Sequence, residues 1–181
     1  MNRQPTLHGE SLLLRPLVEA DWDALYAAAS DPLIWELHPA NDRWQEPVFR
    51  AYFADALAQG GALAVIDNSS GAMIGSSRMQ AHDPADGGSV EIGWTFLARS
   101  HWGGGINREL KRLMLAHALH HVARVDFRVG ESNLRSRRAM EKIGGRLSDR
   151  SEMVKTASGL TRNVVYEITR ESFANGPLQT G

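Results

Sequence analysis

Three successive glycines at the start of a helix constrain this chain more than any other feature of its sequence. Residues 101–110 read HWGGGINREL, and the glycines separate a strand-like stretch, VEIGWTFL (90–97), from a helical pattern over 107–123. Glycine contributes no packing and costs backbone entropy, so three in a row predict a sharp turn or a close approach of another molecule to the main chain. The unpaired N–H groups of a helix start attract anions, so a phosphate group is the candidate ligand.

Apolar periodicity predicts a mixed order of strands and helices around this junction. Alternating apolar patterns predict strands, and a 3.6-residue period predicts helices. The expected strands cover 11–17, 62–67, 72–82, 90–97, 125–129 and two segments that flank a turn at 158–159. The expected helices cover 19–30, 46–61, 107–123 and 134–143, and residues 31–42 form a short helix or turn. The glycines therefore lie between the third strand of an antiparallel meander and the longest helix.

The longest expected helix has an apolar face, whereas the end of the chain has none. Its face is formed by Leu110, Met114 and Ala118, with Leu115, Leu119 and Val122 beside them. Such a stripe predicts that the helix packs on the sheet. Residues 172–181, SFANGPLQTG, carry no comparable pattern and predict a frayed tail.

The composition excludes several kinds of partner and chemistry. Lysine plus arginine (20) nearly balance aspartate plus glutamate (21), so neither nucleic acid nor an anionic membrane is expected as a partner. The 181 residues fit one domain, 1–181, with a core over 6–170 and a tail over 171–181. The lack of cysteine excludes disulfides and a thiol nucleophile and is compatible with a reducing cytosol. With no export signal or spanning segment, we expect a cytoplasmic protein.

Three segments carry a resemblance to a known family. They are LLLRPLVEADWDAL (12–25), VEIGWTFLARSHWGGGINRELKRLML (90–115) and ESNLRSRRAMEKIGG (131–145). With the order of elements, they resemble the GNAT N-acetyltransferases, and within them the ribosomal-protein-alanine acetyltransferase-like (Rim-type) branch, over residues 6–170. The resemblance implies an α/β (α+β) GNAT fold: a mixed, mostly antiparallel twisted sheet of about seven strands flanked by about four helices.

The middle segment is, in this family, the acetyl-CoA motif: Arg or Gln, two residues, Gly, one residue, then Gly or Ala. Trp102, Gly105 and Asn107 stand at the three defined positions, and Trp102 and Asn107 depart from the general pattern, although tryptophan there is familiar in the Rim-type branch. The resemblance implies that the main chain around the glycines binds the diphosphate and that the preceding strand end binds the pantetheine arm. The implied cofactor-binding residues are Phe96, Leu97, Trp102, Gly103, Gly104, Gly105, Ile106, Asn107, Asn133 and Ser136. A plain strand-to-helix loop, and plain core residues at 96 and 97, are the alternatives.

Aminolysis of a thioester needs a deprotonated amine and a stabilised thiolate. Without cysteine, direct attack by the amine is favoured over a ping-pong relay. Glu91 lies in the strand before the cofactor segment, where GNAT enzymes often place a base; a solvated carboxylate or an ion-pair partner is the alternative. It alternates with Val90 and Ile92, so its side chain should face away from theirs. His82 and His101 are weaker candidates, each more typical of a surface histidine.

Two further sets of residues have both a functional and a structural interpretation. Asn133 and Ser136 form an Asn-x-x-Ser pair at a helix start, which is typical of a helix cap. In Rim-type enzymes the matching residues contact the cofactor, and the serine lies near the sulfur as a candidate acid. Trp35, His38 and Trp44 lie in the region that lines the acceptor pocket in this family, although packing explains the tryptophans equally well.

The remaining charged and histidine-rich features favour ordinary surface roles. His117, His120 and His121 have helical spacing, but no acidic ligand accompanies them as in HExxH, so a surface cluster is favoured and no metal is expected. The basic run RSRRAMEK (135–142) either binds the 3′-phosphate of coenzyme A or forms a solvated helix face.

The leading hypothesis is an acetyl-CoA-dependent N-acetyltransferase that acts on a primary amine, at a peptide N-terminus or on a small molecule. The alternative is a catalytically silent acyl-CoA-binding or sensing module. A Rossmann-type nucleotide-binding protein is disfavoured, because the glycines follow a meander and no G-x-G-x-x-G is present. The sequence does not identify the acceptor, and it leaves open whether the protein forms a homodimer.

Overall fold

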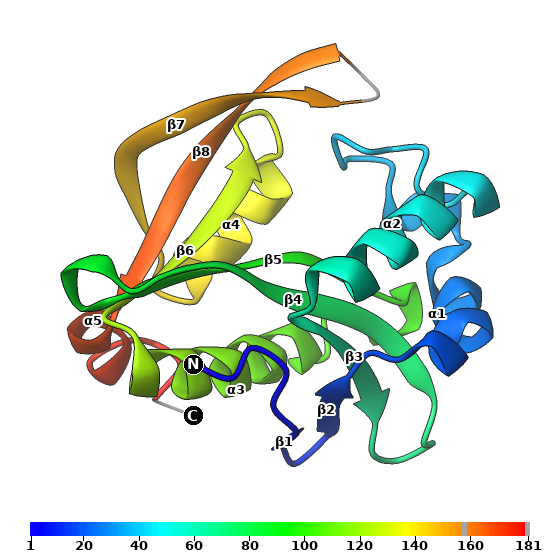
Figure 1. Cartoon of the computed structure of the whole chain (residues 1–181), viewed down its shortest axis with the longest axis horizontal. Helices are drawn as coiled ribbons and strands as arrows, with labels where there is room; N and C mark the ends of the chain where they lie inside the picture. Colours follow the sequence, from blue (N-terminus) through cyan, green and yellow to red (C-terminus); the bar gives the residue numbers. More distant parts are fainter. Residues whose placement is uncertain (157–158, 180–181) are drawn as a thin grey trace.

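Strand β3 (Ala62–Asp67) explains why this chain forms a sheet that is covered on both faces. Its side chains alternate between two buried clusters, with Leu63 and Val65 in one and Ala62 and Ala64 in the other. A strand buried on both faces reads as a continuous apolar run, as ALAVID does. The computed structural model describes residues 1–156 and 159–179, and within them β3 lies inside an eight-stranded sheet (Figure 1).

The sheet is antiparallel except at one place. Its other strands are β1 (Leu7–His8), β2 (Leu12–Pro16), β4 (Met73–Asp83), β5 (Ser89–Leu97), β6 (Arg124–Gly130), β7 (Arg146–Thr156) and β8 (Gly159–Thr169). They are arranged in the order β1-β2-β3-β4-β5-β6-β8-β7. The helices are α1 (Trp22–Ala29), α2 (Glu46–Gln59), α3 (Ile106–His121), α4 (Leu134–Lys142) and α5 (Arg170–Ala174).

The one parallel pairing, between β5 and β6, is short. Only Ser89, Val90 and Glu91 pair with β6, opposite Arg124 to Asp126. Beyond Glu91, β5 continues to pair with β4 on its other side, whereas β6 pairs with β8 over its whole length. The two strands therefore separate in the middle of the sheet, and the far part of β5 has no strand neighbour on that side among the described residues.

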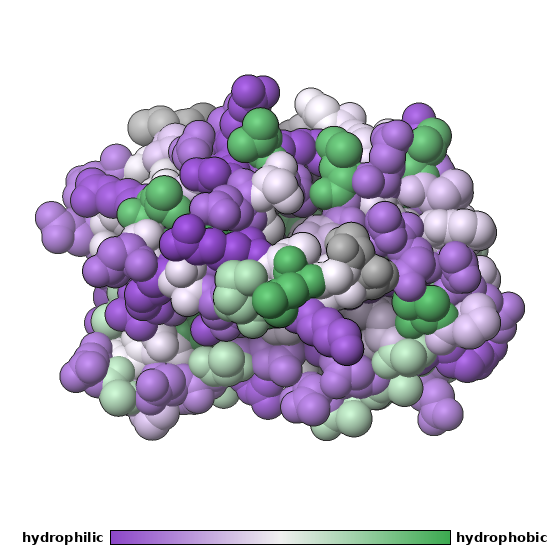
Figure 2. All heavy atoms as spheres, turned by 90° about the horizontal axis from the view of Figure 1, so that it is seen from above, coloured by the Kyte–Doolittle hydropathy of each residue, from purple (hydrophilic) through white to green (hydrophobic). Residues whose placement is uncertain are grey.

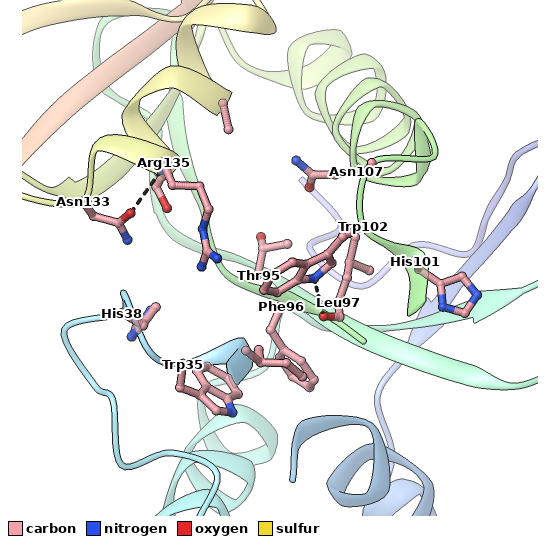
Figure 3. A pocket seen from close by; sticks show the side chains of 14 residues that line it. Trp35, His38, Thr95, Phe96, Leu97, His101, Trp102, Asn107, Asn133 and Arg135 are labelled. Carbon is pink, nitrogen blue, oxygen red and sulfur yellow. Dashed lines mark hydrogen bonds between the residues drawn. The ribbon is translucent and has the colours of Figure 1, made fainter. Parts of the chain in front are cut away.

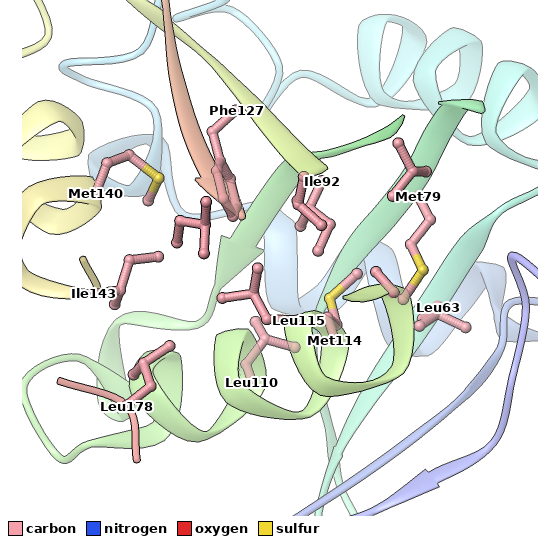
Figure 4. Packing of buried hydrophobic residues seen from close by; sticks show 14 of the residues in the cluster. Leu63, Met79, Ile92, Leu110, Met114, Leu115, Phe127, Met140, Ile143 and Leu178 are labelled. Carbon is pink, nitrogen blue, oxygen red and sulfur yellow. The ribbon is translucent and has the colours of Figure 1, made fainter. Parts of the chain in front are cut away.

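Helices cover the two faces of the sheet. Helices α3 and α4 pack with the sheet through one cluster that includes Leu115, Phe127 and Met140 (Figure 4). Helices α1 and α2 pack on the other face through an aromatic cluster that includes Phe49 and Phe96. All six residues of the predicted stripe on the longest helix are buried, which confirms that prediction.

The fold class expected from the sequence is confirmed, with two additions and one correction. The short strand β1 and the helix α5 were not expected. The prediction of a frayed end over 172–181 is wrong for the described residues, because α5 begins with a capping box at Thr169 and Leu178 is only 2% exposed in the main core. Ser158 of the expected 158–159 turn lies outside the described residues, as do residues 180–181.

The face of the molecule at the top of Figure 1 is mostly hydrophilic. Figure 2 views the molecule from above Figure 1 and shows hydrophobic side chains that are mostly separated by hydrophilic ones. Within residues 1–156 and 159–179, no helix is long and apolar enough to cross a bilayer.

Candidate active site

An irregular stretch of β5 marks the point where it leaves β6. The pairing of β5 with β4 shifts in register between Ser76 and Arg78, and Trp94 takes a φ of +52° there. A positive φ is uncommon for a bulky residue, and bulges and backbone strain are enriched near functional sites. The bulge brings Thr95 into the opening, where it lines both cavities described below.

Two adjoining cavities occupy the opening. The first, of about 310 Å³, lies between the end of β5, the start of α3, the start of α4 and the segment around Trp35 (Figure 3). The second, of about 720 Å³, lies between β5, β6, the segment around Arg43 and the β7–β8 hairpin. The cavities share six lining residues, which are His38, Thr95, Asn107, Asn133, Ser136 and Ala139. The arrangement suits two ligands that meet at this junction.

The glycines at the start of α3 present free main-chain groups. Gly103 and Gly105 have φ values of +81° and +82°, a conformation that glycine adopts without strain. Gly104 has neither a positive φ nor any atom within 4 Å of the place a Cβ would take, so nothing in the described protein requires glycine there. The N–H groups of residues 103–107 make no hydrogen bond within the described part of the chain. These groups form a cradle that suits an anion.

The residues next to the cradle have mixed roles. Trp102 is 42% exposed, and its indole Nε1 donates to the carbonyl oxygen of Leu97 at 2.9 Å. Arg135 lies over the Trp102 ring, with 4.8 Å from its Cζ to the ring centroid. The side chains of Phe96 and Leu97 are buried in the two clusters, as core residues would be. Gly103 and Asn107 line the first cavity.

Glu91 is buried and paired. It is 7% exposed, faces the second cavity, and accepts a hydrogen bond from Arg128, which also contacts Glu152 at 3.2 Å. Val90 and Ile92 lie in the core, so the expected alternation is confirmed. Burial raises the pKa of Glu91, although Arg128 opposes the rise. Of the two structural alternatives, the ion-pair partner fits this arrangement and the solvated carboxylate does not.

In the Asn-x-x-Ser pair, only the asparagine caps the helix with its side chain. The side chain of Asn133 accepts from the backbone N–H of Ser136 at 3.1 Å, so Asn133 is the N-cap of α4. The Ser136 hydroxyl makes no hydrogen bond in the described part of the chain, and it lines both cavities. Capping therefore accounts for Asn133 but not for the hydroxyl of Ser136.

Of the three residues predicted to line the acceptor pocket, two line the cavities and one does not. Trp35 lines the first cavity, and His38 lines both. Burial lowers the pKa of His38 to about 4, and its Nδ1 accepts from the N–H of Ala40 at 2.9 Å, so the ring is neutral at pH 7. Trp44 is 38% exposed and lines neither cavity.

The two weaker histidine candidates stand apart from the junction. His101 lines the first cavity but points away from the other labelled side chains in Figure 3. His82 is exposed and lines neither cavity.

Lys111 is a residue that the sequence reasoning missed. It is 3% exposed, lines the second cavity, and donates from Nζ to Thr95 Oγ1 at 2.7 Å. No carboxylate pairs with it within the described residues, and burial lowers its pKa to about 7. A signal was present in the sequence, because Lys111 interrupts the apolar face of its helix between Leu110 and Met114.

Arg43 and Arg128 were also missed, and no sequence signal points to them. Both line the second cavity, but one comes from an irregular segment and the other from a strand whose partners depend on tertiary pairing. The histidines of the surface cluster have ring centroids 5.0–5.1 Å apart. The described residues contain no group of three or more His, Cys, Asp or Glu side chains that could hold a metal.

The protein is therefore an α/β protein with a splayed sheet and an anion cradle that opens beside a cavity. The chain belongs to the GNAT family, because the model of the acetyltransferase (GNAT) domain matches residues 11–146. No curated protein matches the chain in a sequence search.

Solved structures agree with this family. A putative acetyltransferase shares 27% identity and a TM-score of 0.80, over 94% of this chain and 89% of that one. A putative acetyltransferase from T. thermophilus shares 26% identity and a TM-score of 0.75, over 94% and 92%. A probable acetyltransferase of the GNAT family from Chromobacterium violaceum shares the fold, with a TM-score of 0.81 at 20% identity over 93% and 88%.

Proposed function

We propose that this protein is an acetyl-CoA-dependent N-acetyltransferase of the Rim-type branch, which transfers acetyl to a primary amine. The observation that carries the proposal is the set of free N–H groups at residues 103–107, which opens beside a cavity that continues into a second one. The backbone and the packing around Gly104 do not require glycine, which supports a role for this glycine in letting a ligand approach the main chain closely. The residues present therefore fit the diphosphate of coenzyme A. Trp102 before the glycines supports the choice of branch.

The proposed roles along the two cavities follow from their geometry. Residues 103–107 hold the diphosphate, and main-chain atoms of Phe96 and Leu97 at the open edge of β5 hold the pantetheine arm. Asn133 and Ser136 lie where the two cavities meet, so this junction is the proposed place of the thioester. Trp35 and His38 line the approach to that junction, and we assign them to the acceptor side.

The proposed chemistry is direct aminolysis of the thioester. A bond forms from the amine nitrogen to the acetyl carbon, the carbon–sulfur bond breaks, and the thiolate takes up a proton to leave as the thiol. We assign the removal of the amine proton to Glu91, directly or through water, because its raised pKa suits a base. The free hydroxyl of Ser136 donates a hydrogen bond to the sulfur as negative charge develops on it.

Lys111 and Arg43 give the second cavity a further property that suits an amine substrate. Neither has a carboxylate partner in the described residues; Arg43 is a cation, and Lys111, whose pKa burial lowers to about 7, is one below about that pH. Nearby positive charge lowers the pKa of an amine and so favours the neutral, nucleophilic form.

We further propose that the chain acts as a single domain over 1–181 in the cytoplasm, and its lack of cysteine supports the location.

Thiol release from acetyl-CoA tests the proposal. The wild-type protein is assayed over amines, amino acids, peptides and aminoglycosides, and the product is examined by mass spectrometry for an added acetyl group. We expect release well above the rate without protein for at least one class of amine. Calorimetric binding of acetyl-CoA with no release for any amine would instead favour the silent acyl-CoA-binding module.

A further inference from the structure

The second cavity contains more positive charge than its carboxylates neutralise. The cations that line it are Arg43, Lys111, Arg128 and Lys155, and the carboxylates are Glu91 and Glu152. Both carboxylates contact the same residue, Arg128. Lys111 is bonded only to a threonine hydroxyl, and Arg43 and Lys155 make no ion pair in the described residues. The uncompensated charge therefore lies on Arg43 and Lys155, and on Lys111 when its amine is protonated.

Arg43 is the cation that is best prepared to bind an anion. Its Cζ lies 5.3 Å from the centroid of Trp35 and 4.7 Å from that of Tyr52, so two aromatic rings hold the guanidinium. Its guanidinium makes no hydrogen bond to any described residue, although the residue is only partly exposed. A guanidinium offers five N–H donors in a fixed fork that matches a carboxylate, and holding it in place reduces the entropy lost on binding.

A second guanidinium, that of Arg78, adds to the positive potential at Arg43. Arg78 is 1% exposed and lies 5.6 Å from the centroid of the same Tyr52 ring. Its Nη1 forms an ion pair with the exposed Asp55 at 2.7 Å and donates to Gln80, but its Nε and Nη2 have no hydrogen-bond partner within the described residues, so the charge is only partly neutralised. Burial and the charge of Arg78 both lower the pKa of Arg43. An anion beside Arg43 would relieve this repulsion.

The positions of Ser136, Thr95 and Arg43 indicate how an acceptor would lie in the second cavity. Ser136 and Thr95 line both cavities and lie at their junction, whereas Arg43 lines only the second cavity. An acceptor with its amine at the junction would extend its other end along the second cavity toward Arg43. That end meets a positively charged wall, which disfavours polyamines and aminoglycosides because they carry further positive charge.

We propose that the acceptor is an amino carboxylate, an amino acid or a short peptide-like amine, and that Arg43 binds its carboxylate. The inference rests on the proposed N-acetyltransferase function and names the substrate class of the same site. The specificity then comes from charge: the carboxylate is attracted by Arg43 and by the potential of Arg78, and a second cation on the acceptor is repelled.

The test compares acceptors that differ only at the anionic end. Thiol release is measured for an amino acid series, the matching carboxamides, the amines without the carboxyl group and the matching aminophosphonates. We expect kcat/KM for the carboxylates to exceed that of the carboxamides by about tenfold or more, the usual effect of a hydrogen bond to a charged group. Equal or better use of carboxamides, polyamines or aminophosphonates would overturn the proposal.

Variants assign the preference to Arg43. Arg43→Gln is expected to remove the preference mainly through KM, and Arg43→Lys to keep part of it because the charge remains. Arg50→Gln is the matched control, because Arg50 also lies over a ring, 4.1 Å from the centroid of Trp22, but lines neither cavity. A full carboxylate preference in folded Arg43→Gln contradicts the assignment.

A binding measurement separates failure of this inference from failure of the proposed function. Calorimetry with coenzyme A-saturated wild-type protein compares an N-acetyl amino acid with its carboxamide, and it needs no turnover. Tighter binding of the carboxylate that is lost in Arg43→Gln supports the anion site even if no amine releases thiol. Equal binding of the two compounds rejects the anion site even if the protein acetylates other amines.

Discussion

The carboxylate of Glu91 forms an ion pair with Arg128, and this ion pair affects the pKa at which Glu91 could serve as a base. Burial raises its pKa and Arg128 opposes that rise. Removing the cation should therefore raise the pKa of Glu91 further. Because a base works only when it is deprotonated, the acidic limb of the pH profile of kcat should move to higher pH in Arg128→Met.

The measurement is the pH profile of kcat for the wild type, Arg128→Met and Glu91→Gln. We expect Glu91→Gln to lower kcat by about 10²–10⁴-fold, the usual range for loss of a general base. Arg162→Met is the control, because Arg162 forms an exposed ion pair with Glu131 outside the cavities. Unchanged turnover in Glu91→Gln would leave Glu91 as a partner of Arg128 only.

At the scale of single residues, the sequence predicted which way a side chain faces but not which residues it contacts. The alternation of Val90, Glu91 and Ile92 correctly predicted which way the carboxylate faces, because strand geometry is local. It did not predict Arg128, which reaches Glu91 only because β6 pairs beside β5. The exposed Trp44 and the buried Lys111 show the same limit, since burial depends on distant segments.

At the start of α4, one residue caps the helix and another is a candidate for the chemistry. Asn133 supplies the cap through its side chain, whereas Ser136 supplies only a backbone N–H. Asn133→Ala should therefore lose about 0.5–2 kcal/mol of stability, and Ser136→Ala should lose little. If Ser136 assists the departing thiolate, Ser136→Ala lowers kcat, and the deficit shrinks with a thioester whose thiol is more acidic.

Chemical denaturation and steady-state kinetics of both variants check this pair of expectations. Ser132→Ala is a control on the exposed residue just before the cap, outside both cavities. Wild-type kinetics of Ser136→Ala with both thioesters would exclude a leaving-group role for its hydroxyl.

The glycines before α3 allow a substitution that affects a ligand and spares the fold. Gly104 has open space around it and no positive φ, so Gly104→Ala should leave stability nearly unchanged. If the cradle holds a diphosphate, the added methyl group should weaken acetyl-CoA binding by about tenfold or more, or about 1.4 kcal/mol. Calorimetry measures the affinity, and Gly71→Ala is the control for affinity alone: Gly71 lines neither cavity, and although its φ of +70° makes an added methyl group cost stability, acetyl-CoA binding should not change. Undiminished affinity in Gly104→Ala would remove this loop from the proposed site.

At the scale of the whole molecule, most of the fold was within reach of the sequence. The meander, the glycine junction and the apolar stripe are local patterns, and each corresponds to an observed element. The two-residue β1 and the docking of Leu178 were not predictable in this way, because they depend on contacts with α3 and its surroundings. The second cavity was not predictable for the same reason, since residues from distant segments, including strands β4 to β8 and helices α3 and α4, line it.

The charge inside the second cavity should cost the whole molecule stability, and the cost should depend on pH. The pKa of Lys111 is about 7 in the folded protein, against an ordinary value of 10.5. Between these two values the unfolded chain binds more protons than the folded one, so stability rises with pH in this window. Below pH 7 the folded protein carries the full cost of the buried ammonium, on the order of 5 kcal/mol from the size of the shift.

Lys111→Met removes that cost and therefore should stabilise the protein most at pH 6 and progressively less toward pH 10. Urea unfolding at both pH values, beside the exposed control Lys142→Met, measures the difference. A gain that is equal at the two pH values, or a loss of stability at pH 6, would show that Thr95 and the cavity already compensate the ammonium. A pH-dependent gain accompanied by lost turnover would indicate that Lys111 is retained for the reaction, because a residue kept for stability would not destabilise the fold.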